Sequence, residues 1–248
     1  MNSYHKFAQY YDILTSNIDY QKHSDYYDNI ISQHMPNKGI LLDLACGTGS
    51  LSEDMAKKGY DVIGVDLSEE MLSIALDKKF DSGLPIQYLC QDMCRLDMYG
   101  TIDVTICALD SLNHLPDINS VKRAIERVSL FLNPGGIFIF DINTIYKHKN
   151  ILGNNTFVYD TDDVYCIWQN TYNEKDDSVM IELNFFEKDS DIYRRFDESF
   201  SEKAYNIDEL TKICENSGLE VLNIFDYLTD SLPREDSEKL TVVTRKVR

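Results

Sequence analysis

Apolar positions recur with a helical period in the first 35 residues and then gather into short runs. Phe7, Tyr10, Tyr11 and Leu14 share one face of an expected helix, and a second helix is expected over residues 20–34. Further along, apolar runs alternate with helical patterns; the runs lie at 39–44, 61–65, 86–90, 102–108 and 137–140, and the helical patterns begin at about 50, 69 and 118. Strands that are apolar throughout and alternate with helices indicate a parallel sheet covered on both faces.

The pattern changes after about residue 150. Residues 156–200 alternate with period two, which predicts three or four antiparallel strands. One face is apolar (Val179, Ile181, Leu183, Phe185), and a mixed face is expected to hold Glu182, Arg194 and Phe196. A helix at 207–216 and strands at 219–227 and 240–244 follow.

The expected fold class is therefore α/β, with a doubly wound, seven-stranded, mostly parallel sheet and an inserted antiparallel β cap. We expect residues 1–150 and 204–248 to form the main domain and residues 151–203 to form the cap. A chain of 248 residues is long enough for such a core without disulfides.

Charge and cysteine usage narrow the function. Lys plus Arg minus Asp plus Glu is 24 − 42 = −18, and a field of that sign repels nucleic-acid phosphates and anionic lipid. We therefore expect no nucleic-acid partner and no membrane partner. Six scattered cysteines lack metal-ligand spacing, which favours free thiols in a reducing, cytoplasmic compartment and predicts no metal site. The composition is compatible with a homodimer.

A glycine-rich turn between the first strand and the next helix carries the chemistry. Gly47 and Gly49 follow the apolar run that ends at Leu44, so backbone N–H groups at a helix start can approach a ligand closely. Asp66 ends the second strand, where a carboxylate can accept both hydroxyls of a ribose. The pattern predicts a nucleoside-containing cofactor.

The same residues separate two cofactor classes. A dinucleotide site needs a third Gly or Ala, but Ser52 occupies that position. Asp43 adds a negative charge that suits the cationic sulfonium and ammonium of S-adenosylmethionine (SAM) and disfavours a pyrophosphate. SAM is the expected cofactor, and an NAD-dependent oxidoreductase is the weakest alternative.

Residues 41–50 resemble the first motif of class I SAM-dependent methyltransferases, and residues 64–68 resemble the second. The turn at 91–93 and the Pro-Gly-Gly turn before the fifth strand are similar to later motifs, and Ala45 stands where the family usually has Gly. The opening helix and the inserted strands resemble a bacterial small-molecule-type subgroup. The resemblance implies that the cofactor contacts are Tyr11, Asp43, Ala45, Gly47, Gly49, Asp66, Leu67, Met71, Asp92, Met93 and Leu109.

Two residues are candidates for catalytic roles. The resemblance implies that Tyr11 closes over the methionine carboxylate, although a tyrosine there can also be packed between two helices. His114 follows the fourth strand and can take a proton from an amine or hydroxyl, or can be a structural hydrogen-bond donor. Methyl transfer is an in-line displacement, in which positioning supplies roughly 7–11 kcal/mol, whereas a base adds about 10²–10⁴-fold.

We expect transfer to an amine or hydroxyl of a small-molecule acceptor, bound between the cap, the opening helices and the loop at 110–115. Two alternatives remain: a protein methyltransferase, and a binding module that senses SAM without turnover. The sequence lacks the Asn/Asp-Pro-Pro-Tyr/Phe motif of methyltransferases that act on nucleic-acid bases.

Overall fold

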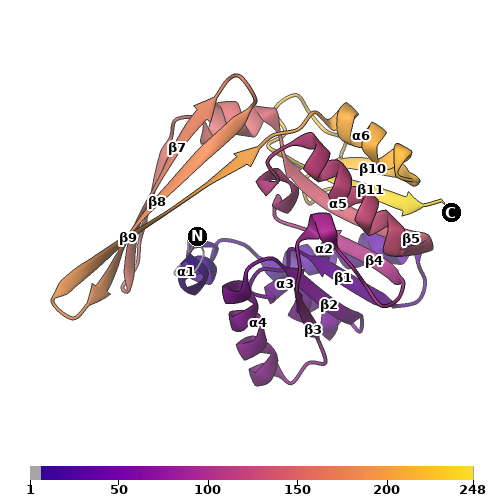
Figure 1. Ribbon diagram of the computed structural model, residues 1–248, viewed down its shortest axis with the longest axis horizontal. Coiled ribbons are helices and arrows are strands. Elements are labelled where there is room, and N and C mark those ends of the chain that lie inside the picture. Colours follow the sequence, from indigo (N-terminus) through magenta and orange to yellow (C-terminus); the bar gives the residue numbers. More distant parts are fainter. Residues whose placement is uncertain (1–6, 248) are drawn as a thin grey trace.

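The computed structural model describes residues 7–247, and a seven-stranded sheet forms its centre. The strand order is β10-β11-β5-β4-β1-β2-β3 (Figure 1). β1 to β5 pair in parallel, whereas β11 runs antiparallel to both neighbours. The strands are β1 Ile40–Leu44, β2 Asp61–Asp66, β3 Gln87–Cys90, β4 Ile102–Cys107, β5 Leu132–Asn143, β10 Leu219–Asp226 and β11 Lys239–Lys246. The expected α/β class and the seven strands are confirmed.

Helices cover both faces of this sheet. α2 (Tyr20–His34) and α3 (Ser50–Lys57) bury Tyr27 and Met55 in one apolar layer. α5 (Ile118–Phe131) and α6 (Ile207–Asn216) contribute to the other layer. α4 (Glu69–Ser82) begins where Ser68 Oγ accepts a hydrogen bond from Met71 N at 3.2 Å, with Glu69 and Glu70 in its first turn.

β5 is longer than the sequence predicts. An apolar strand was expected over 137–140, but β5 extends from Leu132 to Asn143. The Pro-Gly-Gly turn lies inside it as an irregularity, since the register against β4 shifts between Ile102 and Val104. At its other end the strand carries Asp141 and Asn143, both buried, to the edge where β4 also ends.

The cap is a separate four-stranded antiparallel sheet in the order β6-β7-β8-β9. It comprises β6 Thr156–Asp160, β7 Val164–Asn173, β8 Ser178–Asp189 and β9 Ile192–Lys203, and it follows η3, a π-helical turn at Lys147–Leu152. The cap stands away from the main sheet, with α1 (Phe7–Leu14) beside it (Figure 1). Phe7 and Tyr10 of α1 lie against Phe185. Their ring centroids are 6.4 and 6.0 Å, respectively, from the ring centroid of Phe185. The expected antiparallel insertion is confirmed.

The predicted division of the two cap faces is wrong for two of the three residues expected on the mixed face. Phe196 lies directly opposite Phe185, with ring centroids 4.7 Å apart, so it belongs to the apolar inner face. Arg194 lies opposite Glu187 on that same side, and only Glu182 lies on the other face. Residues paired across antiparallel strands share a face, and this pairing depends on a register that strand patterns alone did not fix.

Candidate active site

Three residues of the loop between β1 and α3 have a left-handed backbone conformation. Gly47 and Gly49 have φ of 53° and 79°, and Ala45 shares that conformation at 62°. A Cβ added at Gly49 would lie 2.3 Å from Tyr88 Oη, whereas one added at Gly47 would meet no atom within 4 Å. The loop therefore packs tightly at Gly49 and borders open space at Gly47.

Asp66, at the end of β2, braces this loop. Its Oδ2 accepts a hydrogen bond from Gly47 N at 2.8 Å, and its Oδ1 accepts one from Ser68 N at 2.9 Å. Burial raises the pKa of the Asp66 carboxyl, and the backbone N–H groups oppose that shift by favouring the charged form. The neighbouring Leu67 is exposed, and Gln91 N donates to Asp66 O, which joins the end of β3 to this edge.

Asp43 lies beneath the loop in β1. It is fully buried, and Ser52 Oγ donates a hydrogen bond to its Oδ2 at 2.5 Å. Burial, with a smaller contribution from the negative charge of Asp66, raises the pKa of Asp43 to about 7. A second ionised carboxylate is therefore costly here unless a positive charge is close by.

Three other predicted contacts, Asp92, Met93 and Met71, lie on separate elements. Asp92 caps the 3₁₀ turn η1 (Met93–Arg95), where its Oδ1 accepts from Cys94 N at 2.8 Å, and Met93 packs against the core. Met71, on α4, is buried in the cluster shared by α1 and the inner face of the cap.

The loop after β4 has two consecutive left-handed residues, Leu109 and Asp110, at φ of 56° and 55°. Asp141 fixes them, since its two oxygens accept hydrogen bonds from Leu109 N at 2.8 Å and Asp110 N at 2.6 Å. Backbone strain of this kind costs of order 1–3 kcal/mol per residue and clusters at functional sites. The loop leads into η2 (Ser111–His114), which carries His114.

A buried charge network lies at the same edge. Lys239 Nζ, from β11, is 2.7 Å from Asp110 Oδ1 and 3.6 Å from Asp141 Oδ1. Burial alone would raise the pKa of Asp110, but Lys239 and Lys147 hold it well below its usual range. Burial lowers the pKa of Lys147, whose Nζ donates to Asn143 Oδ1 at 2.9 Å. Sequence reasoning missed this network, because its members come from strands far apart in the chain.

Tyr11 of α1 is brought to this edge. Burial raises the pKa of Tyr11 well above its usual value, and the charges of Tyr20 and Asp110 act on it in the same direction. α1 is tied to the glycine loop by Asp12, which accepts from Thr48 Oγ1 at 2.7 Å and pairs with Lys78 Nζ at 2.6 Å. The structure thus places Tyr11 within electrostatic range of Asp110, on a helix that is hydrogen-bonded to the glycine loop.

His114 lies between the sheet edge and the cap. Its side chain is 39% exposed, and its ring centroid is 5.4 Å from that of Phe200 on β9. The charge of His114 acts on both Asp66 and Asp110. Tyr11 and His114 thus both lie within electrostatic range of Asp110, and His114 also lies within range of Asp66.

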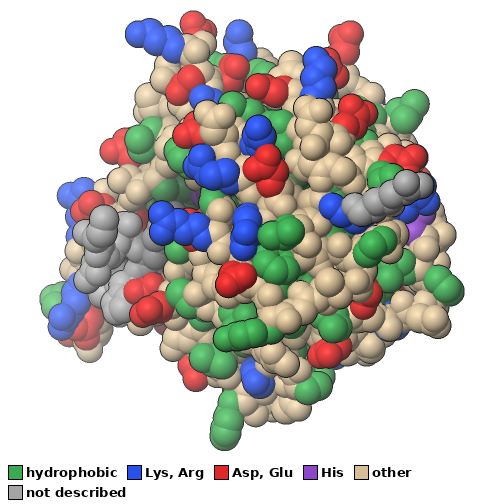
Figure 2. Space-filling model, turned by 45° about the vertical axis from the view of Figure 1, so that its right-hand side comes forward, with side chains coloured by type: hydrophobic (Ala, Val, Ile, Leu, Met, Phe, Trp, Pro, Cys, Tyr) green, Lys and Arg blue, Asp and Glu red, His purple; other side chains and the backbone are tan. Residues whose placement is uncertain are grey.

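The remaining features concern metals, cysteines and membranes. Within residues 7–247, no group of three or more His, Cys, Asp or Glu side chains could hold a metal ion, and the six cysteines are free. No helix in that range is long and apolar enough to cross a bilayer. Acidic and basic side chains are interspersed on the face that Figure 2 shows.

Comparisons with known proteins bear on this arrangement. A family model described as a methyltransferase domain matches residues 41–136. The Bacillus subtilis protein YqeM, which is named as a methyltransferase, is 35% identical over 244 residues, covering 98% of this chain and 97% of that protein. A crystal structure of a SAM-dependent methyltransferase from Clostridium acetobutylicum matches with a TM-score of 0.88 and 37% identity over 98% of each chain. The chain belongs to the class I SAM-dependent methyltransferases.

This methyltransferase also shares its fold with SAM-bound CalS10, an amino pentose methyltransferase from Micromonospora echinaspora. The TM-score is 0.75 at 19% identity, over 92% of each chain. SAM is the cofactor of this methyltransferase, as the likeness to the SAM-dependent enzyme from Clostridium acetobutylicum shows. The site fits it, because the backbone at Gly47 borders open space and the carboxylates of Asp43 and Asp66 suit a cationic ligand that bears a ribose.

Proposed function

We propose that this methyltransferase transfers a methyl group from SAM to an amine or hydroxyl of a small-molecule acceptor. The observation that carries the proposal is the approach of three elements to Asp110 and His114. α1 brings Tyr11, the loop after β4 brings Asp110 and His114, and the cap brings Phe200 against the His114 ring. In this proposal residues 151–203 are the acceptor-binding cap and the remainder is the SAM-binding domain, whose residues 1–6 and 248 lie outside the described range.

Individual residues would hold SAM as follows. Asp66 would accept the ribose hydroxyls, Asp92 and Met93 would meet the adenine, and Tyr11 would cover the methionine carboxylate. Leu67 and Met71 would lie at the adenosine side, and Leu109 would lie beneath the reacting end. The backbone of the loop would approach the ligand along Ala45, Gly47 and Gly49, with Asp43 beneath it. Bound there, SAM supplies a methyl group that its sulfonium already activates.

The chain's own contribution is mainly positioning. Holding two reactants in line is worth roughly 7–11 kcal/mol, and it needs a rigid edge rather than a reactive side chain. Asp141 fixes the backbone of Leu109 and Asp110, and Lys239 fixes the Asp110 side chain. The cap and α1 would exclude water from the reacting atoms.

A polar small molecule suits the region around Asp110 and His114. Lys147 and Lys239 also line a pocket of about 410 Å³, together with Tyr146, Asp226, Tyr227, Arg234, Asp236 and Glu238. CalS10 is named for an amino pentose acceptor, which supports a small polar acceptor here. The net charge of −18 makes a nucleic-acid acceptor unfavourable. The six free thiols support a reducing, cytoplasmic compartment.

The acceptor class can be tested with SAM that carries an isotopic methyl group. The wild-type protein is incubated with this SAM and a cell extract, which is then separated into small-molecule, protein and nucleic-acid fractions for mass spectrometry. We expect the label in a small molecule. Label confined to protein would favour a protein methyltransferase, and SAM binding with no label transfer would favour a sensor.

A further inference from the structure

Glu202 lies where the cap joins the main sheet. It is on the inner face of β9, opposite Val179, and is 5% exposed. Its Oε1 is 3.8 Å from His114 Nε2, and its Oε2 is 3.7 Å from His148 Nε2. Asn143 Nδ2 donates a hydrogen bond to Oε2 at 3.1 Å. One buried carboxylate therefore faces two imidazoles.

The burial of Glu202 needs an explanation, because a buried carboxylate is costly unless charged or polar groups surround it. Within residues 7–247 the basic side chains within 4.0 Å of Glu202 are those two histidines. Lys147 adds a more distant positive charge from η3. The hydrogen bond from Asn143 holds the carboxylate, and the two rings lie beside it.

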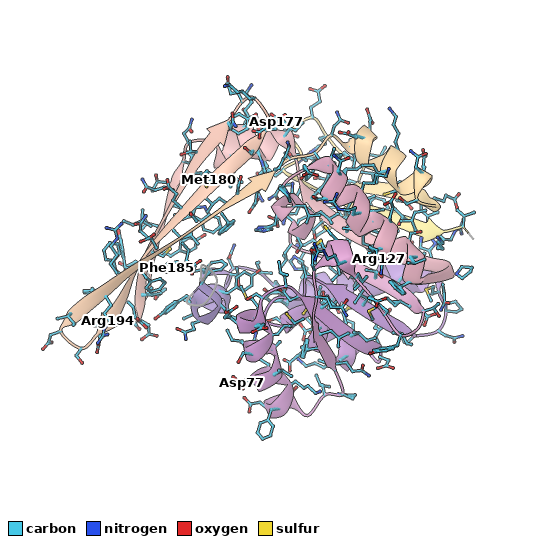
Figure 3. All side chains as sticks on the ribbon, in the orientation of Figure 1. Asp77, Arg127, Asp177, Met180, Phe185 and Arg194 are labelled. Atoms are coloured by element: carbon cyan, nitrogen blue, oxygen red, sulfur yellow. The ribbon has the colours of Figure 1, made fainter. Side chains whose placement is uncertain are left out.

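His148 lies beside the other oxygen of Glu202. The ring is fully buried, and its Nδ1 lies 2.9 Å from Asp177 O, in the turn between β7 and β8. A carbonyl only accepts hydrogen bonds, so Nδ1 carries a proton and Nε2 is directed at Glu202. Nε2 has no hydrogen-bond partner among the described residues. Figure 3 shows Asp177 at the end of the cap nearest the main sheet, with Phe185 further along and Arg194 towards the far tip.

His114 lies beside Oε1 of the same carboxylate. Its Nε2 is 3.8 Å from Glu202 Oε1, its ring lies against Phe200, and it is within electrostatic range of Asp66 and Asp110. Neutral imidazole carries one N–H and one lone pair, and the group beside one nitrogen decides which is which. An Nε2–H beside Glu202 leaves the lone pair of Nδ1 free for another partner.

We propose that Glu202 is a positioning residue, which holds His114 in the Nε2–H tautomer so that Nδ1 can accept the proton that the acceptor loses. This rests on the proposed function. The acceptor nitrogen or oxygen forms a bond to the methyl carbon, the sulfur–methyl bond breaks with its electron pair left on sulfur, and the acceptor proton goes to His114 Nδ1. Glu202 then faces an imidazolium, whose charge it stabilises, and Asn143 keeps the carboxylate in place.

The tautomer can be measured without any acceptor. Protein labelled with ¹⁵N-histidine and bound to S-adenosylhomocysteine is studied by NMR at neutral and alkaline pH, with the His114 signals assigned by their loss in His114→Asn. We expect the Nε2–H tautomer in the wild type, and a mixture of tautomers in Glu202→Gln. Glu182→Gln is the matched control, because it removes the same charge from the opposite face of the cap. An unchanged tautomer in Glu202→Gln overturns the proposal.

A double-mutant cycle separates positioning from a structural role. The readout is the rate of isotopic methyl incorporation into the small-molecule fraction of a cell extract. Glu202→Gln should slow it by about 10- to 100-fold, within the range of base catalysis, with SAM affinity within threefold. In a His114→Asn background the same change should cost less than twofold. A full further loss there would show that Glu202 acts independently of His114.

The two proposals fail in different ways. If NMR shows the expected tautomers but the label enters protein, the acceptor class is wrong and the positioning role remains. If the label enters a small molecule but the tautomer does not respond to Glu202→Gln, only the positioning role is wrong.

Discussion

Replacing Asp66 by Ala should weaken SAM binding more than any other single change in the loop region. The Asp66 carboxylate accepts hydrogen bonds from Gly47 N and Ser68 N, and would accept the ribose hydroxyls as well. The substitution therefore removes ligand contacts and also leaves the loop less firmly held. Both effects act in the same direction.

The magnitude follows from hydrogen bonds to a charged group, each worth about 1.5–3 kcal/mol. If one such bond to the ribose is lost, the dissociation constant rises by about 10- to 150-fold. The loop adds to this, because Gly47 N and Ser68 N lose their partner in the free protein.

Isothermal titration calorimetry with SAM and S-adenosylhomocysteine measures the change. Asp61→Ala is the matched control, since Asp61 begins the same strand and is exposed at the opposite edge. The control should bind within twofold of wild type. If a folded Asp66→Ala protein also binds SAM within twofold of wild type, the assignment of the ribose site is wrong.

Four further outcomes are expected. Ala45→Gly should raise the free energy of unfolding in urea by about 1 kcal/mol, because Ala45 has a φ of 62° that Gly adopts without strain; a loss of stability would contradict this. Burial raises the pKa of Asp43 in the folded state to about 7. The free energy of unfolding of the wild type, measured by denaturant titration, should therefore fall by up to about 4 kcal/mol relative to that of Asp43→Asn as the pH rises from about 4 to 7. Equal pH dependence of the two proteins would refute this. Replacing residues 156–200 with a short Gly-Ser linker should leave SAM binding within a few-fold and abolish transfer, so near wild-type transfer by the folded protein would make the cap structural. Metal analysis of untagged protein should find less than stoichiometric zinc, and a stoichiometric metal needed for turnover would overturn that expectation.

The sequence predicted the elements whose signals are local. Three such elements are the glycine loop, Asp66 at the end of its strand, and Ser68 as the N-cap residue of α4. Each depends mainly on local sequence. Strand alternation likewise predicted an antiparallel insertion, but not its register, so Phe196 was assigned to the wrong face. Register is set by pairing between strands, which the pattern along one strand does not contain.

The charged groups at the sheet edge could not be predicted in the same way. Lys239 reaches Asp110 across 129 positions of sequence, and Asn143 reaches Glu202 across 59. Taken alone in the sequence, each of these side chains is typical of an ordinary polar or charged surface residue. One usable signal was a carboxylate near the end of an apolar strand, since Asp141 lies near the end of β5 and Asp66 ends β2. His148 had no such signal, because the π-helical turn that buries it has no distinctive pattern.

A crystal structure of the protein with S-adenosylhomocysteine tests the central claim most directly. The account predicts ribose hydroxyls on Asp66, the amino acid end beneath Tyr11, and a sulfur that faces the space between Asp110, His114 and the cap. A ligand bound with its sulfur turned away from that space, or at a different edge of the sheet, would contradict it.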